Sequence, residues 1–305
     1  MGQKSSHSLG HGADTPASAL LSTPYEWVAP LGRGGMGEVH LIEHTFLKRR
    51  FALKIVRPQF AGHAQLADRM RLEAQAAARL SHPHIVKIVD FWIASGKRPC
   101  MVMELLEGET VARELLRRRR LPTPEALRYT CQLLSALEAA HELGIIHRDI
   151  KPENLFLHHE ADHGRILKVL DFGIARVMPE ASELAPQPLN VPTKTGTFLG
   201  SPKYASPETL RGEPVDHRSD VFSAGLVCYT MLTGRGAFDR MSANEDWSIF
   251  VPEPPSRHVG RSVPPELDAV ILKAISHGKS NRFQNARAFA AELLPFSEGA
   301  YVQTS

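Results

Sequence analysis

The distribution of hydrophobic and polar positions changes at Tyr25, where a polar stretch gives way to short apolar, partly β-branched runs. These runs predict strands over residues 25–31, 37–43, 51–56, 86–93 and 100–105. A helical period lies between residues 66 and 80, where Met70, Ala74 and Ala77 fall close to one stripe. The first part of the chain is therefore predicted to be rich in strands and to carry one main helix.

The rest of the chain has mainly helical spacing. A helix start is predicted at Thr123-Pro124-Glu125, because threonine caps helices, proline suits the first position and glutamate suits the helix dipole. This helix is predicted to end near Gly144. The apolar run over residues 222–234 is too short to span a bilayer, so it predicts a buried helix.

Two short strands are predicted within the helical part, around residues 155–157 and 166–169. A long polar stretch follows over residues 174–207, rich in Pro, Thr and Gly. A connection of that length is normally functional or disordered. It is therefore a candidate for regulation.

The ends of the chain differ in composition from the part between them. Residues 1–22 are rich in Ser, Gly, His and Ala with little apolar patterning, which predicts a disordered tail. A folded region is predicted over residues 23–297, with a short tail over residues 298–305. The 305 residues are enough for one large domain or two lobes that share a cleft.

Composition and charge narrow the class of protein. Hydrophobic residues make up 43% and charged residues 23%, which is ordinary for a soluble globular protein. The formal net charge of +3 is too small to favour nucleic acid or a membrane surface as the main partner. Cys100, Cys131 and Cys228 give neither a zinc spacing nor a disulfide framework, which fits a reducing compartment. Neither a membrane span nor a secretion signal is visible, so we expect a cytoplasmic location.

Two features of the predicted strands suggest phosphate binding. Glycines in GRGGMGEV, residues 32–39, would let backbone N–H groups approach phosphate oxygens. A dinucleotide fold would need these glycines to open a helix, but a strand is predicted to follow. Lys54 lies inside an apolar strand, where its ammonium is costly unless it meets an anion. Glu73 on the predicted helix would supply an ion-pair partner, although Lys54 could also be a surface lysine on an edge strand.

The densest set of polar groups is IHRDIKPEN, residues 146–154. Asp149 can accept a hydroxyl proton, and Lys151 can neutralise charge on a transferring phosphoryl group. Asn154 can ligate a metal through its amide oxygen. Asp171, in Asp-Phe-Gly after a predicted strand, can bind Mg²⁺ that bridges phosphates. Together these groups predict the transfer of a phosphoryl group.

In this order along the chain, the motifs resemble the eukaryotic-type protein kinases, and more closely their bacterial serine/threonine branch. The resemblance covers roughly residues 25–294. It implies an α+β fold of two lobes, with an antiparallel sheet and one main helix in the smaller lobe and mostly helices in the larger one. The smaller lobe would cover about residues 23–104, the hinge about 104–108 and the larger lobe about 109–297.

The resemblance implies a serine/threonine protein kinase, an ATP-dependent phosphotransferase that uses Mg²⁺ or Mn²⁺ and acts on protein substrates. Lys151, two residues after Asp149, matches the serine/threonine pattern. The implied catalytic set is Asp149, Lys151, Asn154, Lys54 and Glu73, and the implied metal ligands are Asn154 and Asp171. A protein substrate is further implied because Ser206-Pro207-Glu208 and its partner Arg282 are usually missing from small-molecule phosphotransferases.

The resemblance also assigns binding and structural positions. The implied ATP-binding residues are Leu31, Gly32, Gly34, Gly37, Val39, Ala52, Lys54, Met103, Glu104, Leu106, Phe156 and Asp171. Met103 corresponds to the gatekeeper behind adenine, and Glu104 and Leu106 would offer hinge backbone groups. Glu208 is expected to pair with Arg282, and Asp220 to accept hydrogen bonds from the catalytic-loop backbone.

The long polar stretch is expected to regulate activity. Its candidate phosphorylation sites are Thr195, then Thr193, with Thr197 a third, at the spacing where bacterial relatives carry activating threonines. Arg148 and Arg176 resemble a basic pocket that would grip the phosphate. We expect autophosphorylation between two molecules in a transient homodimer. The alternative is that these threonines only fill a polar loop.

Other readings remain open at this point. A pseudokinase scaffold would keep the fold without turnover, and a small-molecule phosphotransferase would share its core. The histidines His158, His159 and His163 suit a solvated hairpin tip better than a metal site. The four arginines over residues 117–120 are either a solvated helix end or a docking patch for acidic partners.

Overall fold

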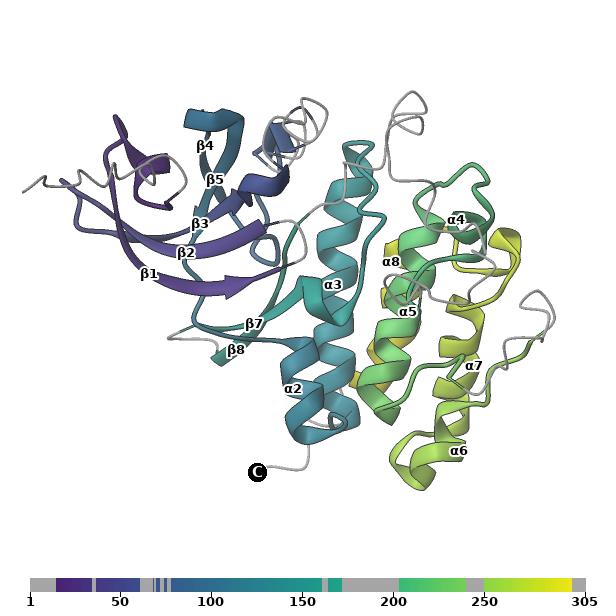
Figure 1. Ribbon diagram of the computed structural model, residues 1–305. Coiled ribbons are helices and arrows are strands. Elements are labelled where there is room, and N and C mark those ends of the chain that lie inside the picture. Colours follow the sequence, from purple (N-terminus) through teal and green to yellow (C-terminus); the bar gives the residue numbers. More distant parts are fainter. Residues whose placement is uncertain are drawn as a thin grey trace, which may run out of the picture. The chain divides into compact units, whose positions relative to one another are not determined.

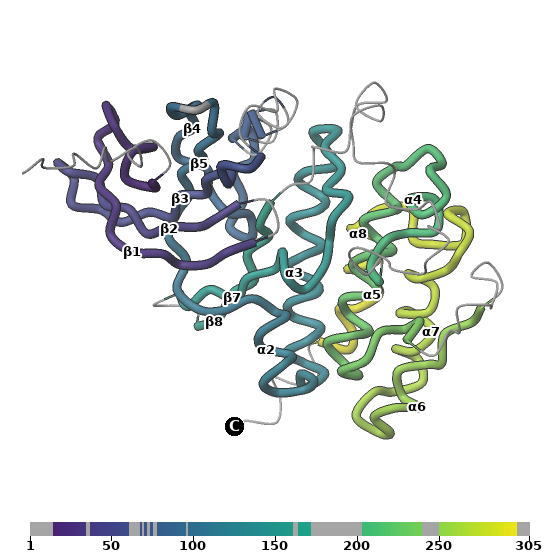
Figure 2. The backbone as a smooth tube through the Cα atoms, in the orientation of Figure 1, coloured from purple at the N-terminus to yellow at the C-terminus, as the bar shows by residue number. Residues whose placement is uncertain are grey.

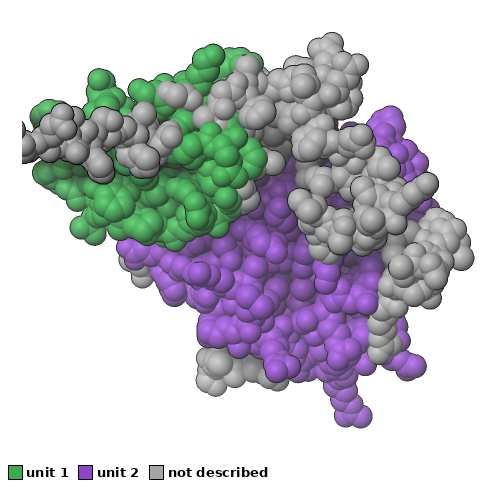
Figure 3. Space-filling model, viewed as in Figure 1, with its two compact units in different colours: residues 1–79, 87–106 green, residues 80–86, 107–305 purple. Residues whose placement is uncertain are grey.

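The computed structural model describes residues 15–34, 37–60, 68, 70–71, 74–75, 78–160, 164–171, 203–239 and 250–297. Two compact units divide the chain. Unit 1 comprises residues 1–79 and 87–106, and unit 2 comprises residues 80–86 and 107–305 (Figure 3). Each unit has a hydrophobic core of its own.

Unit 1 is built on an antiparallel sheet of five strands in the order β1-β2-β3-β5-β4 (Figure 1). The strands are β1 (Tyr25–Arg33), β2 (Gly37–His44), β3 (Arg50–Val56), β4 (Ile88–Ala94) and β5 (Arg98–Glu104). Side chains alternate between the two faces of a sheet, and one face packs into the core. That core contains Ala19, Leu20, Tyr25, Ile42, Phe51, Leu53, Ile55, Cys100 and Val102. The strands expected from the sequence are present, with ends shifted by a few residues.

The segment before β1 differs from the expected disordered tail. Ser18–Leu20 form a 3-10 turn, and both Ala19 and Leu20 are buried. The indole N–H of Trp92 donates to the carbonyl of Ala19 over 3.1 Å. Two apolar side chains and a tertiary hydrogen bond thus hold a segment whose composition shows little pattern.

Part of the helix predicted over residues 66–80 is described. Residues 68, 70–71 and 74–75 are helical, and Met70 and Ala74 are buried. Their burial agrees with the predicted apolar stripe. Glu73 and Ala77 lie outside the described residues.

Unit 2 is mainly helical. Its helices are α2 (Val111–Arg118), α3 (Thr123–Glu142), α4 (Pro207–Arg211), α5 (Arg218–Thr233), α6 (Pro255–Val259), α7 (Pro265–Ala274) and α8 (Ala286–Ser297). Helix α5 is buried from Ser219 to Thr233, and α3, α6, α7 and α8 all pack against it (Figure 1). Gly234 ends it with a φ of 72°, the left-handed conformation that glycine adopts without strain. The apolar run expected to form a buried helix is therefore the centre of this unit.

A small antiparallel sheet lies in unit 2, with the order β6-β7-β8. Its strands are β6 (Gly108–Thr110), β7 (Leu155–Glu160) and β8 (Gly164–Val169). The sequence did not predict β6. Gly108 has a φ of 138°, and a Cβ there would lie 2.0 Å from the carbonyl oxygen of Leu157. This close approach of two strands requires glycine.

The start of α3 corrects one expectation. Thr123 was expected to cap this helix, but Pro122 occupies the cap position and no side chain caps there. The hydroxyl of Thr123 donates instead to the carbonyl of Ser262 over 2.6 Å. A tertiary acceptor 139 residues away takes the place of the local cap, and the local sequence does not reveal it.

The sheet of unit 1 and the helices of unit 2 confirm the α+β class. Cys100, Cys131 and Cys228 form no disulfide. Within the described part of the chain, no helix combines the length and apolar character that a membrane crossing needs.

Candidate active site

The loop that carries Asp149 is anchored by Asp220, in the first turn of α5. The Asp220 carboxylate is fully buried and accepts the backbone N–H groups of His147 and Arg148, each over 2.8 Å. The Nε2 atom of His141 lies 2.8 Å from the same carboxylate. Arg148 has a φ of 64°, which costs a non-glycine residue about 1–2 kcal/mol. Charge-assisted hydrogen bonds of this kind offset that cost and fix the chain direction into Asp149.

His147 connects the catalytic loop to the strand that precedes Asp171. Burial lowers the pKa of His147, so its ring is neutral at pH 7 and has one donor and one acceptor. The Asp149 N–H donates to Nδ1 over 3.3 Å, which leaves Nε2–H to donate to the carbonyl of Leu170 over 3.0 Å. The residue pattern alone assigns His147 no role, although its position two residues before Asp149 is a usable signal.

The Asp149 carboxylate is held by two neighbouring side chains. Lys151 Nζ lies 2.7 Å from Oδ2, and Asn154 Nδ2 donates to the same oxygen over 2.9 Å. The Asn154 amide also donates to the Asp149 backbone carbonyl over 2.8 Å. A 3-10 turn, Pro152–Asn154, returns the chain so that Asn154 reaches Asp149. The carboxylate therefore has a fixed orientation while its side chain stays 29% exposed, so it can be reached from solvent.

Asn154 and Asp171 are neighbours in space as well as candidate metal ligands. The Leu170 N–H donates to the Asn154 carbonyl over 2.8 Å, and Asp171 follows directly. Because the Asn154 amide nitrogen faces Asp149, its side-chain oxygen is the atom left to ligate a metal. Among the described residues, no three His, Cys, Asp or Glu side chains are placed to hold a metal ion. Two oxygen donors fit Mg²⁺, which keeps several waters and binds substrate phosphates rather than a closed protein cage.

In unit 1, four expected ATP-binding residues share the sheet face opposite the core. Val39 pairs with Lys54, and Ala52 pairs with Met103. Cross-strand partners lie on the same face, and residues two apart on one strand do so too. Lys54 is therefore on the face of Val39, Ala52 and Met103, and Leu53 points the other way into the core.

The glycine-rich turn joins β1 to β2 at the end of this sheet. The Gly34 N–H donates to the Gly37 carbonyl over 2.9 Å. A Cβ on Gly37 would lie 3.0 Å from the carbonyl oxygen of Ile55, so a larger residue would press on β3. Leu31 and Gly32, at the end of β1, are exposed. Residues 35–36 lie outside the described part of the chain.

Of the remaining ATP-binding candidates, Glu104 and Leu106 lie where the chain leaves unit 1, whereas Phe156 belongs to unit 2. The Glu104 N–H and carboxylate both bond the backbone of Lys87, over 3.0 Å and 2.9 Å. Leu106 and Phe156 are half-buried. Phe156 lies on β7 between buried Leu155 and Leu157, so it points to the opposite face.

The expected ion pair between Glu208 and Arg282 is present and fully buried. Arg282 forms a two-pronged contact with Glu208, over 2.7 Å and 2.8 Å, and also donates to the carbonyls of Ser276 and His277. Its guanidinium lies 4.6 Å from the ring centre of Phe222. Burial by itself would raise the pKa of Glu208, but hydrogen bonds from Arg282 and Ser219 outweigh it and lower that pKa to about 2.

Several candidates cannot be placed. Glu73, Thr193, Thr195, Thr197 and Arg176 lie outside the described residues, as does His163. His158 faces the backbone of Glu107, and its Nδ1 lies 3.0 Å from that residue's nitrogen.

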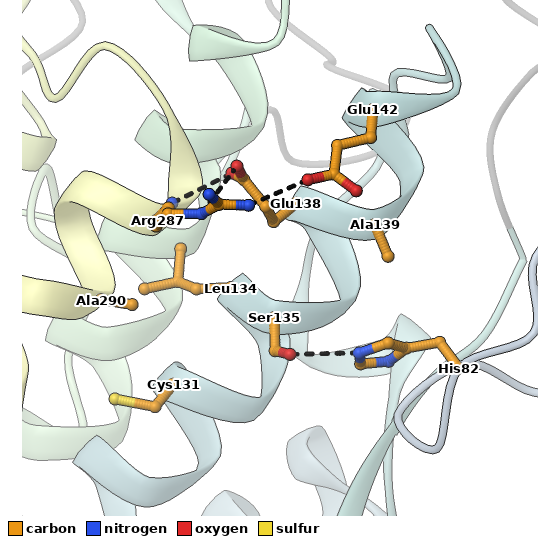
Figure 4. Close-up of a pocket in the computed structure, with 9 residues that line it drawn as sticks. All are labelled: His82, Cys131, Leu134, Ser135, Glu138, Ala139, Glu142, Arg287 and Ala290. Atoms are coloured by element: carbon orange, nitrogen blue, oxygen red, sulfur yellow. Dashed lines mark hydrogen bonds and ion pairs between the residues drawn. The ribbon is translucent and has the colours of Figure 1, made fainter.

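A cavity of about 350 Å³ lies elsewhere in unit 2 (Figure 4). It is lined by residues of α3 and α8 and by His82. Arg287 crosses it to Glu138 and Glu142, over 3.3 Å and 2.9 Å. None of the candidate catalytic residues lines it, so it is separate from the site described above.

The chain is similar to known proteins over most of its length. A family model of the protein kinase domain matches residues 25–293. The serine/threonine-protein kinase PknB of Mycolicibacterium smegmatis is 39% identical over 290 residues, which cover 92% of this chain and 44% of that protein. The serine/threonine-protein kinase pkn2 of Myxococcus xanthus is 37% identical over 289 residues, which cover 91% of this chain and 33% of that protein. The chain thus spans less than half the length of these two relatives.

The crystal structure of the Mycobacterium tuberculosis PknI kinase domain is similar, with a TM-score of 0.70 and 27% sequence identity. The similarity covers 92% of this chain and 99% of that chain. It extends over both units, so the likeness is to a whole domain.

Proposed function

Because this chain belongs to the protein kinase family, we propose that it transfers the γ-phosphoryl group of ATP to serine and threonine hydroxyls of proteins. The family and the protein-kinase fold implied by the motifs are confirmed. The matched relatives carry the name serine/threonine-protein kinase. Lys151, two residues after Asp149, supports the same acceptor class.

The observation that carries the proposal is the arrangement around Asp149. One partly exposed carboxylate is fixed by Lys151 and Asn154, and the loop beneath it is tied to buried Asp220. A general base needs a fixed position within hydrogen-bond reach of the proton that it takes. A scaffold without turnover would not require this, so the arrangement favours an active enzyme over a pseudokinase.

Each residue has a role in the proposed reaction. Asp149 orients the substrate hydroxyl and accepts its proton, and Lys151 stabilises charge on the transferring phosphoryl group. Asn154 and Asp171 would hold the divalent metal, which supplies charge neutralisation on the phosphates. In unit 1, Lys54 would bind the phosphates, with Glu73 as its ion-pair partner, and Val39, Ala52 and Met103 would contact adenine.

Kinases of this family use ATP and a divalent metal in general. Mg²⁺, with Mn²⁺ as a substitute, is our specific proposal, because Asn154 and Asp171 offer only oxygen donors. The proposed substrates are proteins. The buried Glu208–Arg282 pair favours them over small molecules because it fixes the segment that ends the long polar stretch. The reducing environment that suits three unlinked cysteines is consistent with reaction in the cytoplasm.

The proposal is tested by incubating the purified chain with labelled ATP, Mg²⁺ and a generic protein substrate, followed by phosphosite mapping. Label on serine and threonine supports the proposal. Absence of transfer with nucleotide binding retained would instead favour the pseudokinase reading. Label on a small molecule alone would favour the phosphotransferase reading.

Removal of the Asp171 carboxylate should weaken the dependence of ATP binding on Mg²⁺. We expect Asp171→Ala to lower activity at least about 100-fold and to weaken Mg²⁺-dependent ATP binding, because one of two oxygen ligands is lost. Titration calorimetry with and without Mg²⁺ measures this. ATP affinity in EDTA should stay unchanged, and an unaltered Mg·ATP affinity would contradict the role.

Regulation by phosphorylation is a further part of the proposal. Thr195, with Thr193 and Thr197 as alternatives, would be phosphorylated by a second copy of the chain, and Arg148 with Arg176 would bind the phosphate. A phosphothreonine adds about −1.5 to −2 charge, enough to order a loop that faces arginines. The described part of this pocket is Arg148, whose backbone is fixed by Asp220.

Substitution of the threonine should lower turnover of a protein substrate. We expect Thr195→Ala to reduce the rate about tenfold, since the loop loses the charge-assisted contacts that would order it. Arg148→Ala should blunt the gain that phosphorylation gives, and Ser182→Ala, which removes a hydroxyl of the same stretch that is not a candidate site, serves as the matched control. Mass spectrometry before and after phosphatase treatment checks the site. A fully active enzyme without loop phosphate would refute regulation by this route.

A further inference from the structure

The structure divides the four-arginine run after α2 into two unlike halves. Arg117 and Arg118 both pair with the buried carboxylate of Glu114, Arg118 over 3.0 Å. Glu114 also accepts from Arg165 over 2.9 Å. Arg119 and Arg120 are exposed, and among the described residues neither has an acidic partner. Arg117 also pairs with Glu109, and Arg118 with Glu125, so the first half is neutralised within the fold, whereas within the described residues the second half is not.

The second half lies against the end of α5. The Leu121 N–H donates to the Met231 carbonyl over 2.7 Å. A Cβ on Gly234 would lie 2.4 Å from the Arg119 carbonyl oxygen, which shows how closely the two helix ends approach. The next residue, Arg235, is also exposed and has no acidic partner in the described part of the chain. Figure 2 shows the two helix ends at the same edge of unit 2.

Arg119, Arg120 and Arg235 are called the arginine patch below. The C-termini of α2 and α5 carry partial negative charge, which lowers the repulsion between these cations. The helix dipoles therefore make the patch tolerable. They do not require it, because Arg117 and Arg118 already place positive charge in the last turn of α2. Arg119 has a φ of 67°, in a region where glycine is favoured. Arg119 therefore keeps a backbone conformation that favours glycine, beside two more exposed arginines. This indicates that its side chain has a function.

We propose that the arginine patch binds an acidic, Asp/Glu-rich segment of the protein substrate, so this inference rests on the proposed kinase function. The patch is too small for nucleic acid, where binding grows with the number of phosphates neutralised. Glu109 and Glu125, partly exposed beside α2, pair with Arg117 and Arg118, so this side of the patch offers no excess positive charge to a continuous anionic surface such as a membrane. A short acidic segment meets the arginines without covering those carboxylates.

The length of α5 sets the spacing between the acidic segment and the acceptor. Asp220, which anchors the catalytic loop, is in the first turn of α5, and the patch is at its other end. The intervening helix is about 20 Å long at 1.5 Å per residue. An extended chain covers this distance in about six residues. The acidic segment should therefore lie at least about six residues from the phosphorylated serine or threonine.

The test uses two peptides that share one acceptor sequence and one Gly/Ser linker of about eight residues. One ends in an Asp/Glu tail and the other in an Asn/Gln tail. We expect the acidic tail to lower KM about tenfold at low salt with little change in kcat, as three exposed ion pairs allow. Arg119→Gly/Arg120→Gln/Arg235→Gln should abolish the difference between the peptides and leave the neutral peptide unaffected. High salt should also reduce the preference.

Two variants separate docking from a structural role. Arg117→Gln removes the same charge from the neutralised half of the run and should keep the preference for the acidic tail. Arg119→Gly relieves backbone strain, so its thermal stability should equal or exceed that of the parent while the preference falls. If the variants lose the preference for the acidic tail in step with thermal stability, whichever charge they lack, the proposal is overturned.

Equal KM values for the two peptides at low salt would overturn the docking proposal and leave the kinase function intact. If neither the two peptides nor the generic protein substrate is phosphorylated, the kinase function fails and the patch is judged by fluorescence anisotropy of the labelled acidic tail alone. If the acidic tail does not bind, or binds the triple variant equally well, the docking role of the arginine patch is overturned. Tighter binding of a single-stranded oligonucleotide or an anionic lipid vesicle, lost in the triple variant, would also overturn it by reassigning the ligand.

Discussion

Asp149→Asn should reduce the rate of phosphoryl transfer by about 100-fold or more with the fold intact. General-base catalysis contributes about 10²–10⁴ in rate, and an amide cannot take the hydroxyl proton. The amide oxygen of the new side chain can still accept from Lys151 and Asn154, whose bonds to Asp149 are 2.7 Å and 2.9 Å long. The loss should therefore appear in kcat rather than in folding or ATP binding.

Steady-state kinetics, thermal unfolding and ATP binding should be measured on the same preparation. Asp90→Asn is the matched control, since it removes one exposed carboxylate, on β4 in unit 1, and should leave turnover unchanged. Near-normal kcat in Asp149→Asn would remove Asp149 from the role of base. A fall in kcat that accompanies a large loss of stability would point to a structural role.

Arg282→Ala should destabilise unit 2 by about 3–5 kcal/mol, the usual cost of breaking a buried ion pair by removing one partner. Arg282 is 2% exposed and makes hydrogen bonds to Glu208, Ser276, His277 and Arg218. Its loss leaves the buried Glu208 carboxylate without its charged partner, although the Ser219 hydroxyl still donates to it. Denaturant unfolding followed by fluorescence measures the change.

The double variant Glu208→Leu/Arg282→Met is the informative comparison. It removes both charges at similar volume, so it should be less destabilised than Arg282→Ala. The pH dependence adds a second readout. The pKa of Glu208 is about 2 in the folded protein against an ordinary 4.5. Its contribution to stability is therefore complete above pH 4.5 and is lost as the pH falls toward 2.

The double variant lacks Glu208, so it should not show the loss of stability that this carboxylate causes between pH 4.5 and 2. A wild-type chain that keeps its full stability between pH 4.5 and 2, relative to the double variant, would contradict the pKa shift assigned to Glu208. Equal stability of Arg282→Ala and the parent would show that the buried pair contributes nothing.

The described part of the candidate site illustrates what long-range contacts add to a motif. Asp149, Lys151 and Asn154 lie within six residues, so their proximity follows from the chain itself. Their fixed orientation does not, because it depends on Asp220, which is 72 residues after Arg148 in sequence. Likewise His147 becomes a bridge only because β8 brings Leu170 beside it.

The sequence by itself determined the identity and order of the chemical groups, and through them the family. It also determined the strands of unit 1 and the buried helix α5, because apolar periodicity is a local property of the chain. The tertiary structure decided which groups meet. Strand β6 forms only where Gly108 can approach β7, Thr123 finds Ser262 rather than a local cap, and Arg165 reaches buried Glu114 from 51 residues away. Each of these depends on a partner far away in sequence, and no local pattern specifies the distance to such a partner.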